Sequence, residues 1–132
     1  MKNNVFTSIN EAKNRRTTQY LILQTLRCRA STLKSLKNQV RVKVNAIKKE
    51  DKNFCFVLPN IPDCAALNLK AVIDFWIKVG FIKEKARRKQ KNKVILFITT
   101  QGLARFSFIV QNSNGVGLNL VARKLFPANK CR

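Results

Sequence analysis

Residues 63–85 read DCAALNLKAVIDFWIKVGFIKEK, and the hydrophobic pattern changes within this segment. Up to Gly80 the apolar residues recur every three or four positions, which predicts an amphipathic helix over about 64–79 with Asp63 as its N-cap. Gly80 is typical of the left-handed residue that ends a helix. The apolar face of this helix is expected to consist of Leu69, Val72, Ile73, Trp76 and Ile77.

After Gly80 the apolar residues recur at every second position, which is typical of strands. Residues 81–85 and 93–100 are expected to form a hairpin around the basic loop 86–92. The alternation continues over 104–110 and predicts a third strand. The pair Asn114-Gly115 is a strong hairpin signal. A fourth strand is therefore expected over 116–122, followed by an extended basic tail over 123–132.

Upstream of residue 63 the pattern predicts a helix and then a short strand. Leu33, Leu36, Val40, Val44 and Ile47 follow helical spacing, with Ser31 or Thr32 as the cap. The alternation over 40–44 would also suit a strand, but we favour a helix over 32–47. Residues 54–58 are expected to form a strand that stops at the following prolines. A short helix is expected over 4–14, and the apolar stretch 20–26 has no assigned type.

The charge of the chain is its strongest functional signal. Its 132 residues contain 27 Lys and Arg against 6 Asp and Glu, a net charge of +21. A protein with this imbalance repels itself and binds polyanions. Nucleic acid phosphate is the natural counter-charge, and an anionic membrane surface is the second.

The same composition argues against an enzyme. The chain has no His, which is the commonest general base and metal ligand in proteins. It contains no Gly-rich phosphate loop and no nucleophile elbow, and its six scattered acidic residues form no recognisable two-carboxylate site. We therefore expect no catalytic residue, no cofactor and no small-molecule substrate. The apolar runs are shorter than a bilayer requires, so no membrane partner is expected.

The four cysteines are Cys28, Cys55, Cys64 and Cys131. Their spacing is not that of a zinc ribbon, and no His can complete a mixed site. No signal peptide opens the chain, which disfavours a disulfide scaffold. We expect buried or half-buried thiols and no metal site.

Candidate RNA contacts are the cations outside the expected apolar faces and the small polar residues in turns. The hairpin loop is the densest cluster, and cations crowded on a short loop repel one another unless phosphate neutralises them. The helix 32–47 adds cations and an amide that can reach a 2′-hydroxyl or a base edge. The candidates are Arg15, Arg16, Lys34, Lys37, Asn38, Arg41, Lys43, Asn60, Lys70, Arg87, Arg88, Lys89, Lys91, Asn112, Ser113, Asn114 and Lys130.

Several short segments occur in an order that resembles the family of the eighth ribosomal protein of the small subunit. The resemblance covers about residues 32–126. It is carried by LKSLKNQ at 33–39, LPN at 58–60, NLKAVI at 68–73, VGFIKE at 79–84, VILFI at 94–98 and GLNL at 117–120. The amino-terminal domain of that family is a helix–strand–helix–strand–strand unit, the same order that the hydrophobic pattern predicts.

This resemblance implies a structural protein that binds the central domain of small-subunit ribosomal RNA and contacts neighbouring ribosomal proteins. Three features depart from the family. About 30 residues precede the similar region, and in an alternative register the first family helix falls at 8–16. No Ser/Thr-Lys-Gly loop, which grips RNA in the family, follows Leu120. The abundant Asn and Lys suggest an organelle-encoded mitochondrial protein, with a plastid or a bacterial cytoplasm as alternatives.

Together the elements predict an α+β fold, namely an αβαββ unit with a reduced β carboxy-terminal part. We expect a basic amino-terminal extension over 1–31 and an RNA-binding αβαββ domain over 32–101. A truncated β part with a basic tail is expected over 102–132.

Two other functions fit parts of the pattern. A helix followed at once by a basic hairpin imitates a winged-helix DNA-binding protein. The filled apolar face of helix 64–79 and the four expected strands after Gly80 argue against it. A cationic protein of a membrane surface needs a strongly basic helix face, and helix 64–79 has only Lys70 and Lys78 on its polar side.

Overall fold

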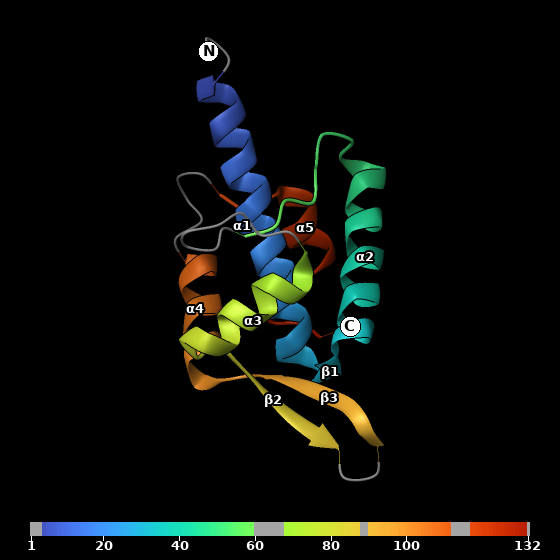
Figure 1. Cartoon of the computed structure of the whole chain (residues 1–132). Coiled ribbons are helices and arrows are strands. Elements are labelled where there is room, and N and C mark those ends of the chain that lie inside the picture. Colours follow the sequence, from blue (N-terminus) through green and yellow to red (C-terminus); the bar gives the residue numbers. More distant parts are fainter. Residues whose placement is uncertain (1–3, 60–67, 88–89, 112–116, 132) are drawn as a thin grey trace.

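The computed structural model describes residues 4–59, 68–87, 90–111 and 117–131, and of residues 4–9, 87 and 90–93 it describes the backbone alone. Over this part of the chain the fold is α+β, as predicted, with five helices and one three-stranded antiparallel sheet (Figure 1). The elements are α1 (Asn4–Cys28), β1 (Ser31–Thr32), α2 (Leu33–Glu50), α3 (Leu69–Val79), β2 (Ile82–Arg87), β3 (Gln90–Ile98), α4 (Thr100–Gln111) and α5 (Leu120–Leu125).

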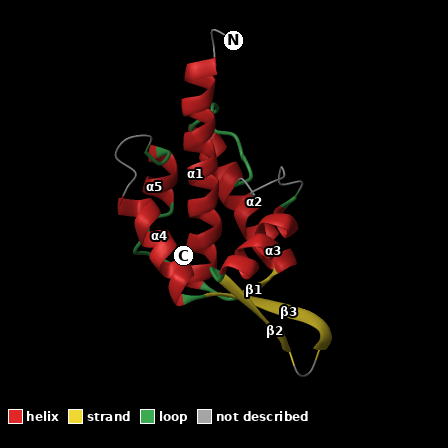
Figure 2. Cartoon of the chain, turned by 60° about the vertical axis from the view of Figure 1, so that its left-hand side comes forward, coloured by secondary structure: helices red, strands yellow, loops and turns green. Residues whose placement is uncertain are grey.

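Helix α1 is the central element of the fold. It is a single helix, where the sequence predicted a short helix over 4–14 and an unassigned stretch over 20–26. All seven side chains of 20–26 are buried, the polar Gln24 and Thr25 included, so neighbouring elements cover this part of the helix on all sides. Figure 2 shows α1 in the middle, with α2 and α3 on one side and α4 and α5 on the other. The small sheet lies at the carboxy-terminal end of α1 (Figure 1).

Helix α2 confirms the helical prediction for 32–47 and excludes the strand alternative. Thr32 is its N-cap, and the Thr32 hydroxyl accepts a hydrogen bond from the Ser35 backbone N–H at 3.1 Å. This cap satisfies one of the backbone donors that a helix start leaves without a partner. The buried stripe of α2 consists of Leu36, Val40, Lys43, Val44 and Ile47.

Helix α3 and its glycine stop confirm the pattern of residues 63–85, apart from the start of the helix. The helix begins at Leu69 and not near residue 64, because Asn68 is its N-cap and accepts from the Ala71 N–H at 2.9 Å. Asp63, the predicted cap, lies outside the described residues. At the other end Gly80 has a φ of 94°, a left-handed conformation that favours glycine.

The predicted hairpin is present, but its strands extend into the loop expected over 86–92, and its second strand ends at Ile98. Strand β1 extends the hairpin to a sheet of order β1-β3-β2. In its register Ile82 faces Ile98, Glu84 faces Leu96, and Ser31 also faces Leu96. Ile82 and Leu96 are buried, so this face of the sheet packs on the helices. The other face carries Lys83 and Lys85, which are exposed on β2.

No strand forms over 54–58, which corrects the prediction for this segment. The segment is hydrogen-bonded to α1 and does not join the sheet. The Val57 backbone N–H donates to the Thr18 hydroxyl at 3.2 Å, and the Phe54 side chain is buried. A short apolar segment can pack one side chain into the core as easily as it can pair with a strand, because hydrophobicity alone does not choose between the two.

The third and fourth strands expected after residue 101 are also wrong, because the structure has helices α4 and α5 there. Gly102, Phe106 and Ile109 are the buried residues of α4, and their spacing of four and three is helical. Of the apolar residues that alternate over 104–110, Phe106 is buried but Phe108 is 54% exposed. In α5 the Asn119 side chain accepts from the Ala122 N–H at 3.1 Å and starts the helix.

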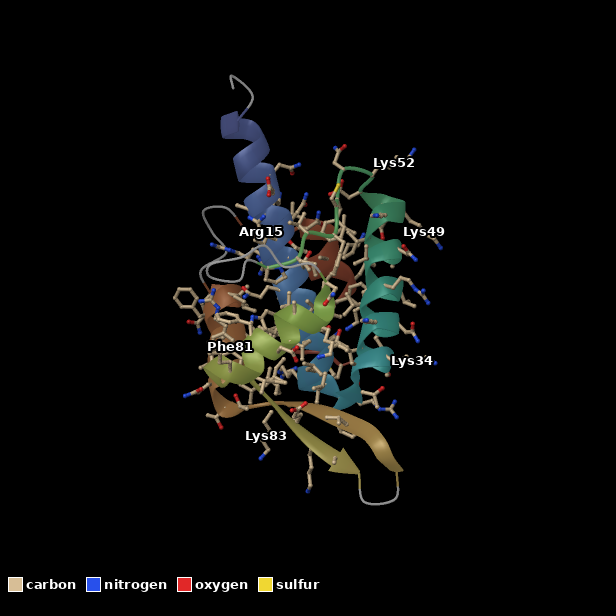
Figure 3. All side chains as sticks on the ribbon, viewed as in Figure 1. Arg15, Lys34, Lys49, Lys52, Phe81 and Lys83 are labelled. Atoms are coloured by element: carbon tan, nitrogen blue, oxygen red, sulfur yellow. A yellow bond between two sulfur atoms is a disulfide. The ribbon has the colours of Figure 1, made fainter. Side chains whose placement is uncertain are left out.

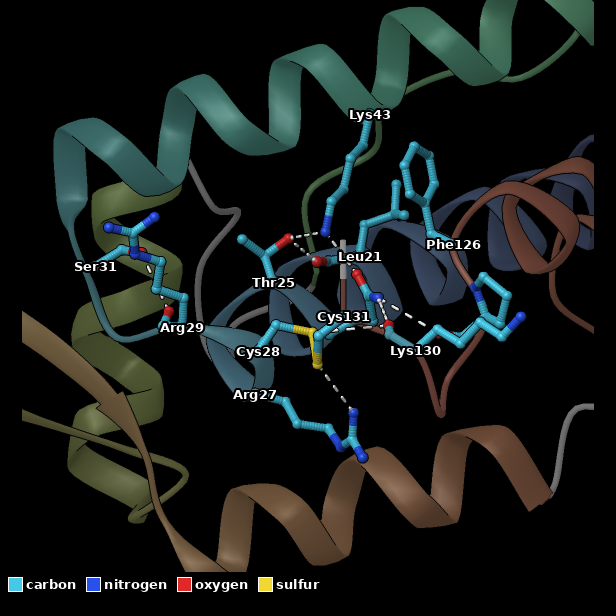
Figure 4. The surroundings of a disulfide bond; sticks show 12 residues. Leu21, Thr25, Arg27, Cys28, Arg29, Ser31, Lys43, Phe126, Lys130 and Cys131 are labelled. Atoms are coloured by element: carbon cyan, nitrogen blue, oxygen red, sulfur yellow. Dashed lines mark hydrogen bonds between the residues drawn. A yellow bond between two sulfur atoms is a disulfide. The ribbon is translucent and has the colours of Figure 1, made fainter.

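The last described residues are tied back to α1, which corrects the expected extended tail. The Gln24 amide Nε2 donates to the backbone oxygens of Pro127 and Lys130 at 3.4 and 3.0 Å. Next to these bonds Cys28 and Cys131 form a disulfide with Cα atoms 5.2 Å apart (Figure 4). The prediction of unbridged thiols is therefore wrong for this pair.

The other two cysteines differ from this pair. Cys55 is a free and exposed thiol, and Cys64 lies outside the described residues. The expected division of the chain after residues 31 and 101 stays a prediction. The β structure expected for 102–132 is replaced by α4 and α5.

Candidate nucleic-acid interface

The outward stripe of α2 carries four of the predicted contact residues. Lys34, Lys37, Asn38 and Arg41 are exposed, because the buried stripe that packs on α1 takes the opposite side of the helix. Figure 3 shows Lys34 extending from α2 away from the rest of the fold. The Arg41 guanidinium donates to the Asn38 side-chain oxygen at 3.3 Å, which links two of these residues on adjacent turns.

A groove of about 780 Å³ runs between the start of α2, helix α3 and the inner face of the hairpin. It brings together three predicted contact residues from two helices: Lys34, Asn38 and Lys70. Two carboxylates also line it, Asp74 and Glu84. The Lys70 ammonium donates to Asp74 at 3.0 Å, so the charge of this groove is mixed.

A smaller cleft of about 310 Å³ lies further along α2, and we call it the Phe56 cleft. Its rim is polar and its floor is apolar, and none of its lining residues is acidic. The lining residues are Lys37, Val40, Arg41, Val44, Asn45, Lys48, Phe56 and Leu69. Lys37 and Arg41 are predicted contact residues, whereas Asn45, Lys48 and Phe56 are not among the predictions. The spacing of 37, 41, 45 and 48 along one helix was a signal for the polar rim, whereas the contact with Phe56 is made by the fold.

Lys43 is not on the exposed side of α2, contrary to the prediction. Only 8% of it is exposed, and its ammonium donates to the Gln24 side-chain oxygen at 2.6 Å and to the Thr25 hydroxyl at 2.8 Å (Figure 4). It also lies 5.3 Å from the centre of the Phe126 ring. Burial lowers the pKa of Lys43 from 10.5 to about 8. Lys43 therefore joins α2 to α1 inside the fold and does not face a ligand.

The hairpin, which projects beyond the start of α2, carries a second group of cations. Lys83 and Lys85 are exposed on β2, and Figure 3 shows Lys83 pointing away from the helices. Arg87 ends β2 and Lys91 lies on β3, which places both near the tip. Arg88 and Lys89 lie outside the described residues, as do Asn60, Asn112, Ser113 and Asn114.

The remaining candidates lie on α1 and in the last segment. Arg15 is half-buried, and its guanidinium donates to Glu11 at 2.7 Å and to the Leu58 backbone oxygen at 3.3 Å. Arg16 is also half-buried and has a partner in the structure. The side chain of Lys130 is exposed beside the disulfide. These residues are separate from the stripe on α2, so the structure does not gather all the candidates into one site.

The described residues contain no group of three or more His, Cys, Asp or Glu side chains that could hold a metal ion. Among the described helices, none combines the length and the apolar character needed to cross a membrane.

Comparison with known proteins adds no relative. No family model, no curated protein and no solved structure matches this chain. The arguments for function therefore come from the residues and their arrangement.

Proposed function

We propose that this chain is a structural RNA-binding protein of the small ribosomal subunit, working in a mitochondrion. The observation that carries the proposal is the exposed cationic stripe of α2, in a chain whose net charge is +21. Its six acidic residues can neutralise only a small part of the 27 cations, and this excess of positive charge favours binding to an external polyanion.

The arrangement of the exposed cations favours the backbone of RNA as the polyanion that this chain binds. Cations on a helix face and on a projecting hairpin can each contact phosphates, and amides such as Asn38 can contact 2′-hydroxyls. The deep groove of A-form RNA is closed to side chains, so recognition would rest on phosphate, 2′-hydroxyl and shape. The α2 stripe begins beside the hairpin, with Lys34 and Asn38 in one groove with Glu84, whereas Lys83 and Lys85 lie on the other face of the hairpin, so the cations face RNA from more than one direction.

The ribosomal part of the proposal rests on the resemblance over residues 32–126. Helices α2 and α3 and the hairpin stand in the order of that family's amino-terminal domain. The strand before Pro59 is missing, and α4 and α5 replace the later strands. The expected partners are the central domain of small-subunit ribosomal RNA and neighbouring ribosomal proteins.

A winged-helix DNA-binding protein is the second candidate, because one observation favours it. The order α1-β1-α2-α3-β2-β3 with a β1-β3-β2 sheet places a helix directly before a basic hairpin. The two later strands that argued against this class are absent from the described residues. Against it, α3 buries Leu69, Val72, Ile73 and Trp76, and its exposed side carries Asp74, which phosphate would repel.

A binding titration separates the two candidates. The full chain is titrated with a transcript of the small-subunit central domain, with a length-matched unrelated RNA and with duplex DNA, each over a series of salt concentrations. We expect the ribosomal transcript to bind most tightly, with an affinity that falls steeply with salt. Preference for the duplex, with protection of a two-fold site, would favour the DNA-binding class. Failure to bind any RNA in dilute buffer would refute the proposal.

The hairpin tip is tested by the triple variant Arg87→Gln, Arg88→Gln, Lys89→Gln. Each phosphate contact contributes roughly 0.7–0.9 to the magnitude of the slope of log affinity against log salt, so losing three contacts should lower that magnitude by about two to three. Its unfolding midpoint should match that of the parent protein. An unchanged slope would show that the tip does not contact RNA.

A further inference from the structure

The Phe56 cleft combines an exposed aromatic ring with a rim of cations. Phe56 is 38% exposed, whereas Phe54, two residues earlier, is 1% exposed. Single exposed apolar residues are common on protein surfaces. Phe56 differs because it lines a hollow together with Val40, Val44 and Leu69.

The segment that holds Phe56 is fixed on both sides of the ring. Before it, Phe54 is buried and its N–H donates to the Asp51 backbone oxygen at 3.2 Å. After it, the Val57 N–H donates to Thr18 on α1 at 3.2 Å, and Arg15 on α1 donates to the Leu58 oxygen at 3.3 Å. A ring held in place by its backbone loses little freedom when it binds a ligand, which favours affinity.

The charged residues that line the cleft around the Phe56 ring are all cationic. Lys37, Arg41 and Lys48 line the cleft from three successive turns of α2, and Asn45 lies between them. All four are exposed at the rim, while the floor is apolar. This arrangement matches a ligand with a flat apolar face and anionic groups beside it.

We propose that the Phe56 cleft binds one unpaired RNA nucleotide, with its base against the Phe56 ring and its flanking phosphates on Lys37, Arg41 and Lys48. The proposal rests on the proposed RNA-binding function and adds a site to it. Stacking of a base on an aromatic ring and phosphate contact with cations are the two features of single-strand recognition. Asn45 adds an amide that can bond to a base edge or a 2′-hydroxyl.

The dimensions of the cleft favour one nucleotide over larger ligands. At about 310 Å³ it is at the lower limit of small-molecule sites, which are roughly 300–1,000 Å³. An amphipathic peptide helix needs a groove with anchors over several of its turns. The cleft offers one exposed ring, so a peptide helix would leave most of its apolar face uncovered.

The test uses the full chain and two probes, a nine-nucleotide oligoadenylate and an abasic strand with the same number of phosphates. Phe56→Ala should weaken binding of the oligoadenylate by about tenfold, the loss expected for one stacked base, and leave binding of the abasic strand unchanged. The triple variant Lys37→Gln, Arg41→Gln, Lys48→Gln should weaken both probes and lower the salt slope by about two.

Phe108→Ala is the matched control, because Phe108 is an exposed phenylalanine on α4 outside the cleft. It should bind both probes like the parent protein. Phe56→Leu keeps an apolar floor without a ring and should lose the oligoadenylate preference. If Phe56→Ala fails to fold, Phe56→Leu alone still tests whether the Phe56 ring binds a base.

The outcomes separate this site from the proposed function. If the parent protein binds the ribosomal transcript but Phe56→Leu and Phe56→Ala bind oligoadenylate like Phe108→Ala, the cleft is not a nucleotide site and the RNA-binding function stands. If the parent protein binds neither the transcript nor the oligoadenylate, both proposals fail.

Discussion

Substituting the buried Lys43 by Met should change the dependence of stability on pH. The substitution keeps a long unbranched side chain and removes the charge. It also leaves the side-chain oxygen of Gln24 without its 2.6 Å donor, while the Thr25 hydroxyl keeps its bond to the Leu21 backbone oxygen. At neutral pH the loss of this hydrogen bond opposes the gain from removing a buried charge, so the net effect on unfolding free energy should be small.

The magnitude of the pH effect follows from the pKa of Lys43. Folding lowers this pKa from 10.5 to about 8, because burial disfavours the charged ammonium. At about 1.4 kcal/mol per pH unit, this difference corresponds to about 3 kcal/mol of unfolding free energy. Below pH 8 the amine is protonated in both states and the cost is present in full. Between pH 8 and 10.5 the unfolded chain binds more protons, so stability rises with pH.

Urea unfolding followed by the fluorescence of Trp76, which is buried, measures this effect. Both proteins carry Cys55→Ser and Cys64→Ser, because a free thiolate at alkaline pH would attack the disulfide. Relative to Lys43→Met, the parent protein should gain about 3 kcal/mol from pH 7.5 to pH 10.5. This gain corresponds to a midpoint shift of about 1 to 3 M urea.

The comparison cancels the other titrating groups. Tyr20, whose pKa burial raises to about 12, destabilises the fold above pH 10 in both proteins. Parallel curves of stability against pH for the two proteins would refute the reasoning, because they would show that Lys43 keeps its ordinary pKa.

Two further substitutions test the packing of the fold. Cys28→Ser removes a link between residues 103 apart, and chain entropy predicts a loss of roughly 4 kcal/mol in non-reducing urea unfolding. The variant should match the reduced parent protein, and a loss under 1 kcal/mol would contradict the entropic estimate. Gly102→Ala places a methyl group against the Phe81 backbone oxygen and 2.7 Å from Ile98 Cγ1, so it should destabilise the fold by about 1 to 3 kcal/mol. Ser107→Ala, on the exposed side of α4, should change the urea midpoint little, and equal effects of the two would contradict the close contact.

Local signals predicted some elements well, because their patterns depend on neighbours in sequence. Three such signals were correct: the 3.6-residue period of α3, the glycine at 80 that ends it, and the two-residue period of the hairpin. Each depends only on residues within one helical turn or one hairpin. The alternation over 104–110 wrongly predicted a strand, and the reason is physical. Phe106 is buried and Phe108 exposed, so only part of the apolar set lies on the core face, and the apparent period of two reflects a surface phenylalanine.

Long-range arrangement could not be predicted in this way. The disulfide joins the end of α1 to a segment that the hydrogen bonds of Gln24 hold nearby, and nothing near Cys131 in sequence indicates that contact. Lys43 is a different case, because it lies within the helical spacing of the apolar residues 36, 40, 44 and 47. A helical projection of α2 would have placed it inside the fold. The Phe56 cleft required the tertiary structure, since its ring and its cations come from separate segments.

The position of the disulfide also sets when it can form during synthesis. Cys28 leaves the ribosome first, but its partner follows 103 residues later. At 5–20 residues per second that interval is roughly 5 to 20 s, long enough for the intervening helices to assemble before the second sulfur emerges. The disulfide therefore forms after the apolar core and stabilises an arrangement that already exists. It does not direct the folding of the nascent chain.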